Sequence, residues 1–323
     1  MTAPSTTQQQ SNTYRSEFSC LQLLFSRCLY TLTLFTLSLS SVHAENYIPP
    51  HLVKITTPRY RPAAELANIP LGTYEYSVGW EGINAASCSV TVDKHGDSYV
   101  IESAARTYSG VDLLYKLRYT ATSILSAKDF SSKSLVIEQQ ENTRHKQIAI
   151  EFAPDLRDIY AIRGKGPNDP NKKTVSFAPG NFTLDPVGAT FLARTVDWNV
   201  GDTKHFDVFN GKSRYLISLT AHKRTTLDIN GETRPVIALV PHVRNLTAIK
   251  PGSKLRDATI YVSDDSKREV LRIESAVFIG RVITELERFT PKTVTHPLLH
   301  VVENLDENSM RAQLHKDFAI AAN

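Results

Sequence analysis

Apolar and polar residues alternate over most of the chain between residues 71 and 290, and the pattern is clearest at its start. In residues 73–80 every second position is apolar or aromatic, and residues 86–92 repeat this pattern after a short link that contains Gly82. A period of two is typical of strands with one buried face, and a glycine-containing link favours a hairpin. The pattern therefore predicts a β-hairpin that opens a long antiparallel sheet.

Further runs rich in β-branched and aromatic residues follow, and they bring the prediction to about thirteen strands. Residues 113–125 fit either a helix or a strand, and their second half favours a strand. Asn210-Gly211 and Asn230-Gly231 each separate two such runs, with residues 215–219 and 225–229 taken as separate strands. Asn-Gly favours the type I′ turn, whose two central residues need a positive φ, so we expect two tight hairpins there.

Residues 184–198 depart from the alternating pattern. Asp185 can cap a helix, and Pro186 suits the first helical position because that position needs no N–H partner. Apolar residues then recur at helical spacing, although Gly188 weakens the helix. Together these patterns predict an all-β fold: a large curved antiparallel sheet, half-closed barrel or sandwich, with one short helix near residues 185–197.

The N-terminal region is typical of an exported protein. The apolar run 29–39 follows Arg15 and Arg27, and it precedes small residues that end at Ala44. This arrangement predicts a cleavable signal peptide over residues 1–44 and a periplasmic location, with no transmembrane anchor after cleavage. We expect residues 45–70 to form a Pro-rich extended leader or a disordered linker. Residues 71–290 form one β domain, and 291–323 a polar tail that is partly disordered or a short helix.

Charge and cysteine content limit the function further. The formal net charge is only +4, and no dense basic block with interleaved aromatic residues is present, so nucleic-acid binding has little support. Cys88 is the one cysteine beyond residue 44 and lies on the apolar face of its predicted strand. It is therefore expected to be a small core residue, and the fold depends on core burial rather than on an internal disulfide.

Two groups of residues could carry chemistry. Asp185 and Arg194 lie on the predicted helix, where they could contact a ligand, form a structural ion pair, or leave Arg194 as a long stem that reaches solvent. Asp264 and Asp265 are weak metal candidates within a charged turn. The sequence contains neither His-Glu-x-x-His nor Gly-x-Ser-x-Gly, so it specifies no catalytic geometry and no cofactor.

An ordered set of short motifs resembles domain-of-unknown-function family 3108, whose members are exported bacterial proteins. The motifs are Tyr74-x-Tyr-x-Val-x-Trp80-x-Gly82, Leu114-Tyr115-Lys116-x-Arg118, Asp185-Pro186 with Leu192-Ala-Arg194, Ser263-Asp264-Asp265 with Arg268, and Gly280-Arg-Val282. The resemblance covers roughly residues 71–286. This chain has Glu269-Val270 where the family tends to have a proline. The resemblance implies a β-rich periplasmic or envelope protein and no established activity.

These observations favour a non-enzymatic exported protein that binds an amphiphilic or glycan envelope component in a concave β-sheet. Tyr115, Arg118, Asp185 and Arg194 are the predicted ligand contacts. One alternative is a structural or assembly partner of an envelope complex that uses a sheet edge or the tail. Another is a cell-wall polymer hydrolase that uses acidic residues such as Asp185 and Asp264. The expected partner is an envelope lipid, glycan or protein.

Overall fold

The computed structural model describes residues 47–154, 157–166, 168–248, 258–276 and 280–292, so the predicted signal peptide and nearly all of the predicted tail lie outside it. Within these residues, fifteen strands form one sheet. The strands are β1 (Gly72–Trp80), β2 (Ile83–His95), β3 (Ser98–Thr107), β4 (Leu117–Ser126), β5 (Ser132–Glu141), β6 (Arg144–Phe152), β7 (Ile159–Gly164), β8 (Lys173–Phe177), β9 (Thr183–Leu184), β10 (Thr203–Phe209), β11 (Arg214–Ile229), β12 (Glu232–Asn245), β13 (Ala258–Ser263), β14 (Val270–Ala276) and β15 (Arg281–Pro291).

The sheet consists of two meanders that meet in its middle. Its strand order is β8-β7-β6-β5-β4-β3-β2-β1-β15-β14-β13-β12-β11-β10-β9. The chain therefore runs outward from β1 to one edge, crosses to the opposite edge, and returns to β15 beside β1. Neighbouring strands are antiparallel, except that β9 pairs with β10 in parallel. The predicted all-β fold is confirmed.

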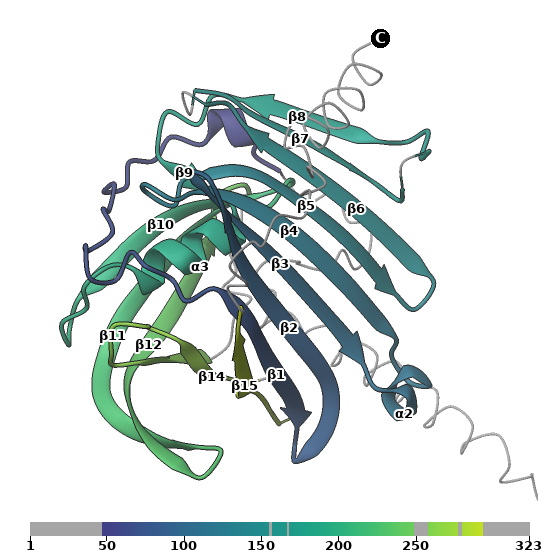
Figure 1. Cartoon of the computed structure of the whole chain (residues 1–323). Helices are drawn as coiled ribbons and strands as arrows, with labels where there is room; N and C mark the ends of the chain where they lie inside the picture. Colours follow the sequence, from purple (N-terminus) through teal and green to yellow (C-terminus); the bar gives the residue numbers. More distant parts are fainter. Residues whose placement is uncertain (1–46, 155–156, 167, 249–257, 277–279, 293–323) are drawn as a thin grey trace, which may run out of the picture.

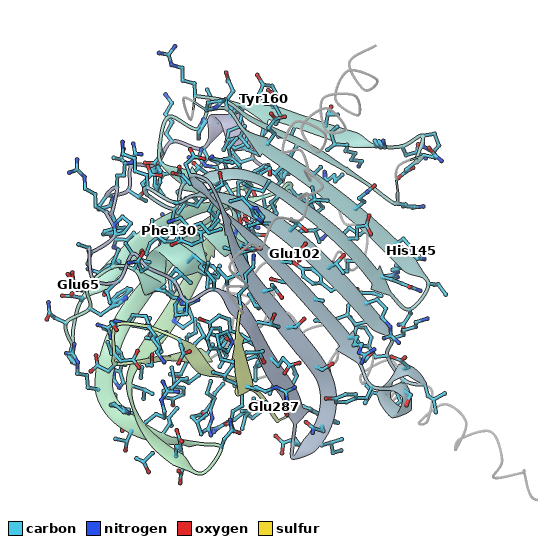
Figure 2. All side chains as sticks on the ribbon, viewed as in Figure 1. Glu65, Glu102, Phe130, His145, Tyr160 and Glu287 are labelled. Atoms are coloured by element: carbon cyan, nitrogen blue, oxygen red, sulfur yellow. The ribbon has the colours of Figure 1, made fainter. Side chains whose placement is uncertain are left out.

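The sheet curls around a helix, α3 (Pro186–Arg194), which lies on its concave side (Figure 1). A twisted sheet of this size curls rather than staying flat. The alternating residues of each strand divide accordingly: on β4, Tyr119, Ala121 and Leu125 are buried, whereas Thr120 faces outward and is exposed. Side chains from both meanders project towards α3 and build one hydrophobic core (Figure 2).

One local prediction is confirmed by the structure and two are corrected. The second half of segment 113–125 is a strand, β4, which begins at Leu117 after a short helix α2 (Ser109–Asp112). Residues 214–229 form one strand with a bulge near Ala221 rather than two strands. The connection at Asn210 has four residues, and the Asn210 side chain accepts hydrogen bonds from the N–H groups of Lys212 and Ser213 at 3.1 and 2.9 Å, so no type I′ turn forms.

The other Asn-Gly pair forms the predicted turn. Ile229 pairs directly with Glu232, and the φ angles of Asn230 and Gly231 are 53° and 79°. Positive φ at both central residues defines the type I′ turn that the Asn-Gly dipeptide favours. The difference between the two pairs arises because the Asn210 side chain replaces a tight backbone turn with its own hydrogen bonds.

A buried ion pair between β10 and β11 lies where the two edges of the sheet meet. Arg214 and Asp207 are both 0% exposed, and the guanidinium donates to the carboxylate through Nε at 3.1 Å and Nη2 at 2.5 Å. Arg214 also lies over the ring of Phe177 in β8, and that ring contacts Phe209 of β10 with centroids 5.0 Å apart. Side chains of the two outer parts of the sheet therefore meet, and the barrel is half closed.

The N-terminal segment 47–71 crosses this junction. The Arg214 guanidinium donates to the carbonyl oxygens of Val53 at 3.0 Å and Pro50 at 3.4 Å, at the short 3-10 helix η2 (Pro50–Leu52). Further along, the Tyr60 hydroxyl accepts a hydrogen bond from the backbone N–H of His205 at 2.9 Å. In the structure this segment is extended and packed against the sheet.

Candidate functional site

Asp185 caps the start of α3. Its side chain is fully buried, and its Oδ1 accepts hydrogen bonds from the N–H groups of Val187 at 2.7 Å and Gly188 at 3.0 Å. The hydroxyl of Ser123 donates to Oδ2 at 3.1 Å, and the Asp185 N–H donates to the Ser132 hydroxyl at 2.8 Å. These bonds tie the helix to β4 and β5. Burial raises the pKa of the Asp185 carboxyl above its usual value.

Arg194 fixes the other end of α3. It is 6% exposed, and it donates through Nε to the carbonyl oxygen of Arg268 at 2.8 Å and through Nη2 to that of Lys267 at 3.3 Å. Its guanidinium also lies 5.5 Å from the centroid of the Tyr74 ring. Arg194 and Asp185 therefore have separate partners at opposite ends of the helix. The predicted pair of residues does not form one constellation.

The acidic turn Ser263–Arg268 is held by its own hydrogen bonds. Asp264 accepts from Arg224 Nε at 2.7 Å and Arg268 Nη1 at 2.8 Å. Asp265 accepts from the Ser263 hydroxyl at 2.7 Å. Burial raises the pKa of both carboxyls, but these hydrogen bonds outweigh it and hold the pKa values below the usual range. Within the described part of the chain, no three His, Cys, Asp or Glu side chains gather where they could hold a metal ion.

Segments far apart in the sequence meet at this turn. Arg194 from α3, the turn Ser263–Arg268 and Tyr74 from β1 lie together, and each belongs to one of the motifs that carry the family resemblance. The motifs are thus brought together by the curl of the sheet, because β1, β14 and α3 all contribute to its concave side. Sequence spacing alone does not indicate this meeting point.

An apolar pocket, here called the α3 pocket, lies beside this meeting point. Its volume is about 50 Å³, and it lies between one face of α3 and the inner faces of β10–β14. Arg194 is the one charged residue of its lining, which consists of Pro186, Ala189, Thr190, Ala193, Arg194, Phe206, Ile217, Leu219, Leu239, Ile260, Val262, Val270 and Ile273. Apart from Arg194, sequence reasoning missed these residues, because alternating aliphatic residues only indicate a buried face.

Tyr115 and Arg118 lie elsewhere, between α2 and the start of β4. Tyr115 is 2% exposed, whereas Arg118 faces outward and pairs with Asp112 through Nη1 at 3.0 Å and Nη2 at 2.5 Å. The Thr107 hydroxyl accepts a further bond from Arg118 at 3.3 Å. The four predicted ligand contacts are therefore distributed over three places, and only Arg194 lines the α3 pocket.

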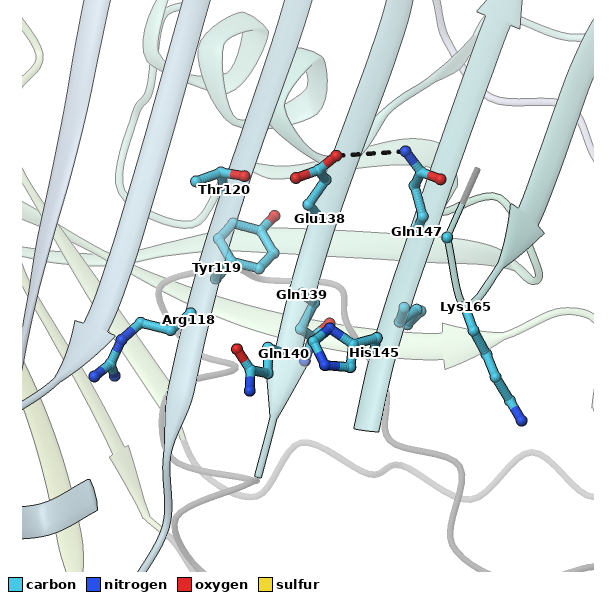
Figure 3. Close-up of a pocket in the computed structure, with 11 residues that line it drawn as sticks. Arg118, Tyr119, Thr120, Glu138, Gln139, Gln140, His145, Gln147 and Lys165 are labelled. Carbon is cyan, nitrogen blue, oxygen red and sulfur yellow. Dashed lines mark hydrogen bonds between the residues drawn. The ribbon is translucent and has the colours of Figure 1, made fainter. Parts of the chain in front are cut away.

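Arg118 also lines a polar furrow on the outer face of the sheet (Figure 3). Two cavities of about 340 and 470 Å³ share Arg118, Tyr119 and Thr120 and extend across β1–β6. In Figure 3, Glu138 and Gln147 lie beside Thr120 on neighbouring strands, and Gln147 Nε2 donates to Glu138 Oε1 at 3.4 Å. Gln140 lies further along β5, where it pairs with Arg118. This outer furrow offers amide, hydroxyl and charged groups at the regular spacing of the strands, ~4.8 Å.

Fold and pockets together define an all-β protein whose single sheet curls around one short helix. Residues 75–287 match the family described as Protein of unknown function (DUF3108), and the chain belongs to this family, as its motifs predicted. The family description assigns no activity. No curated protein matches the chain. No helix among the described residues has both the length and the apolar character needed to cross a membrane.

Three solved structures are similar to this chain, each over its whole length. A β-barrel-like protein of domain of unknown function DUF1849 from Brucella abortus matches with a TM-score of 0.47 and 8% identity over 70% of this chain. A protein from Bacteroides fragilis, described as exported with a YmcC-like fold, matches with a TM-score of 0.27 and 7% identity over 76%. A protein from Parabacteroides distasonis, described as a lipoprotein, matches with a TM-score of 0.26 and 9% identity over 73%.

Proposed function

We propose that this protein is an exported, non-catalytic binding protein that takes the apolar end of an envelope amphiphile into the α3 pocket. The observation that carries the proposal is the composition of this pocket: a mostly apolar lining with one buried cation, Arg194. Concave apolar pockets with a few convergent polar groups are the usual form of small-molecule sites. The apolar run 29–39 and the small residues before Glu45 support export.

The dimensions of the pocket limit the ligand. A volume of about 50 Å³ has room for roughly four water-sized groups, and its apolar lining offers water few hydrogen-bond partners. An alkyl end suits this space, since each buried methylene contributes about 0.8 kcal/mol. The Arg194 guanidinium, whose Nε and Nη2 bind the carbonyl oxygens of the adjacent turn, supplies a positive charge for an anionic headgroup.

Filling the pocket tests the proposal. Ala193, which is 5% exposed, lines the pocket from α3, so Ala193→Leu would place three extra carbons in it. Titration with a fluorescent fatty acid should give a dissociation constant at least about tenfold higher for this variant than for the wild type. Ala149→Leu, on the outward face of β6, is the matched control and should bind normally. Equal affinities for all three proteins would refute the proposal.

The outer furrow favours a second candidate function, glycan binding. Its polar side chains lie at strand spacing across β1–β6, so an extended polar polymer could bind several of them at once. Titration of ¹⁵N-labelled protein with soluble cell-wall oligosaccharides should then shift the Gln140 and Gln147 side-chain amide signals. Gln147→Ala should weaken binding, while Ala193→Leu should leave it unchanged. Absence of shifts at millimolar oligosaccharide would exclude this function.

A further inference from the structure

Three large apolar side chains project from one end of the barrel. Leu113 is 88% exposed, Ile83 57% and Tyr108 37%. Ile83 follows the tight turn that joins β1 and β2, whereas Tyr108 and Leu113 flank α2. The Tyr108 N–H donates to the Ala85 carbonyl oxygen at 3.1 Å, so the two loops are neighbours. Figure 1 shows α2 and the β1–β2 hairpin at the same end of the sheet.

Several cationic residues lie at the same end of the sheet. The Lys116 N–H donates to Asn142 Oδ1 at 2.8 Å, and this bond holds the β5–β6 turn beside the segment that links α2 to β4. Arg144, which is exposed, follows that turn. Four carboxylates at this end accept hydrogen bonds within the protein: Asp112 from Arg118, Glu81 from the Arg281 N–H, Glu274 from Arg281 Nη1, and Glu141 from Gln139. Five cations outnumber them, and they are Arg106, Lys116, Arg118, Arg144 and Arg281.

This combination suits an anionic lipid surface better than a protein partner. A side chain that is 88% exposed at a loop corner would need a complementary pocket on a protein, whereas it can enter the boundary between headgroups and acyl chains of a fluid bilayer without one. Lys and Arg beside it are attracted to anionic headgroups. We propose that this surface, the α2 end (Ile83, Tyr108, Leu113, Lys116 and Arg144), docks the protein on an anionic membrane surface.

Docking can be tested with the full chain, expressed in a cell that can export it. The N-terminus of the wild type and of every variant is checked by intact mass. In flotation assays, the wild type should bind vesicles of phosphatidylethanolamine and phosphatidylglycerol, and bind phosphatidylcholine vesicles much less. Leu113→Glu and Ile83→Glu should each lower the partition coefficient about tenfold. Arg144→Glu should lower binding to anionic vesicles alone, and added salt should weaken wild-type binding.

Matched controls come from exposed apolar residues elsewhere in the chain. Leu52 and Val200 are 60% and 54% exposed and lie in η2 and in the loop after α3. Leu52→Glu and Val200→Glu should bind vesicles like the wild type. An effect of Leu113→Glu no larger than that of the controls would overturn the proposal. Equal wild-type binding to neutral vesicles, or self-association through the α2 end without vesicle binding, would also overturn it. The α3 pocket plays no part in this test, so either proposal can fail alone.

Discussion

Replacing Asp207 with Asn should destabilise the protein strongly, because it leaves a buried guanidinium without its counter-ion. Asp207 accepts four hydrogen bonds: two from Arg214, one from the Thr183 hydroxyl at 2.7 Å and one from Asn181 Nδ2 at 3.1 Å. Both members of the ion pair are 0% exposed. Removing one partner of a buried ion pair typically costs roughly 3–5 kcal/mol of stability, and we expect a similar loss for Asp207→Asn.

This cost is large relative to the total stability of a protein, which is about 5–15 kcal/mol. For a domain of this size, each kcal/mol lowers the melting temperature by about 2–4 °C, so Asp207→Asn should lower it by about 6–20 °C. Urea unfolding monitored by circular dichroism gives the corresponding free energy. Glu75→Gln is the matched control, because it removes an exposed ion pair with Arg288, whose side chains are 39% and 70% exposed. Exposed pairs contribute about 0–1 kcal/mol.

A double-mutant cycle separates the ion pair from other effects of the substitution. Arg214→Met alone removes the Arg214 donor from the carbonyl oxygens of Val53 and Pro179, so it should also be strongly destabilising. The double variant Asp207→Asn/Arg214→Met should lose less free energy than the sum of the two single variants. A loss for Asp207→Asn no larger than that for Glu75→Gln, or strict additivity in the cycle, would refute the account of how the sheet edges are held together.

Three further predictions concern single buried groups. Gly188→Ala should lower the free energy of unfolding by about 1–3 kcal/mol, because the new Cβ would lie 2.6 Å from the Ser132 hydroxyl. This loss is expected although Ala has a better helix propensity than Gly. The control is Gly110→Ala in α2, where a Cβ meets nothing within 4 Å, and it should be close to neutral in urea unfolding. Burial raises the pKa of the Cys88 thiol to about 12. In a variant in which the N-terminal cysteines are replaced by serine, a thiol reagent should therefore label Cys88 at neutral pH only after unfolding. Rapid labelling of the native protein would contradict the burial of Cys88. Burial lowers the pKa of Lys146 from 10.5 to about 8. Between pH 8 and 10.5 the unfolded chain therefore binds more protons than the folded protein, so the free energy of unfolding should rise over this range. The urea unfolding midpoint of Lys146→Met should lack this rise.

Local patterns were sufficient for much of the fold. Alternation identified the buried face of β1, where Tyr74 and Val78 are each 1% exposed, because a strand with one covered face needs a period of two. Asp185-Pro186 located the start of α3, since capping and the fixed φ of proline act within a few residues. Asn230-Gly231 gave its turn for the same reason. These signals are local, so they can be recognised without knowledge of the surrounding fold.

Other features depended on contacts between distant segments. The pairing of β1 with β15 sets residue 72 against residue 291, and no local pattern encodes such a partner. Likewise, nothing near Arg194 indicates that its hydrogen-bond partners are the carbonyl oxygens of residues 267 and 268 rather than Asp185.

By itself, the sequence determined the strands, the single central helix and the family, because burial periodicity, capping and motif order are properties of short stretches of chain. The tertiary structure decided how the sheet curls, where the α3 pocket forms and which charges are buried. The physical reason is that a pocket or a buried ion pair forms only when residues from separate strands come within a few ångströms of one another. The packing of the whole sheet stabilises these contacts, and no short stretch of sequence encodes them.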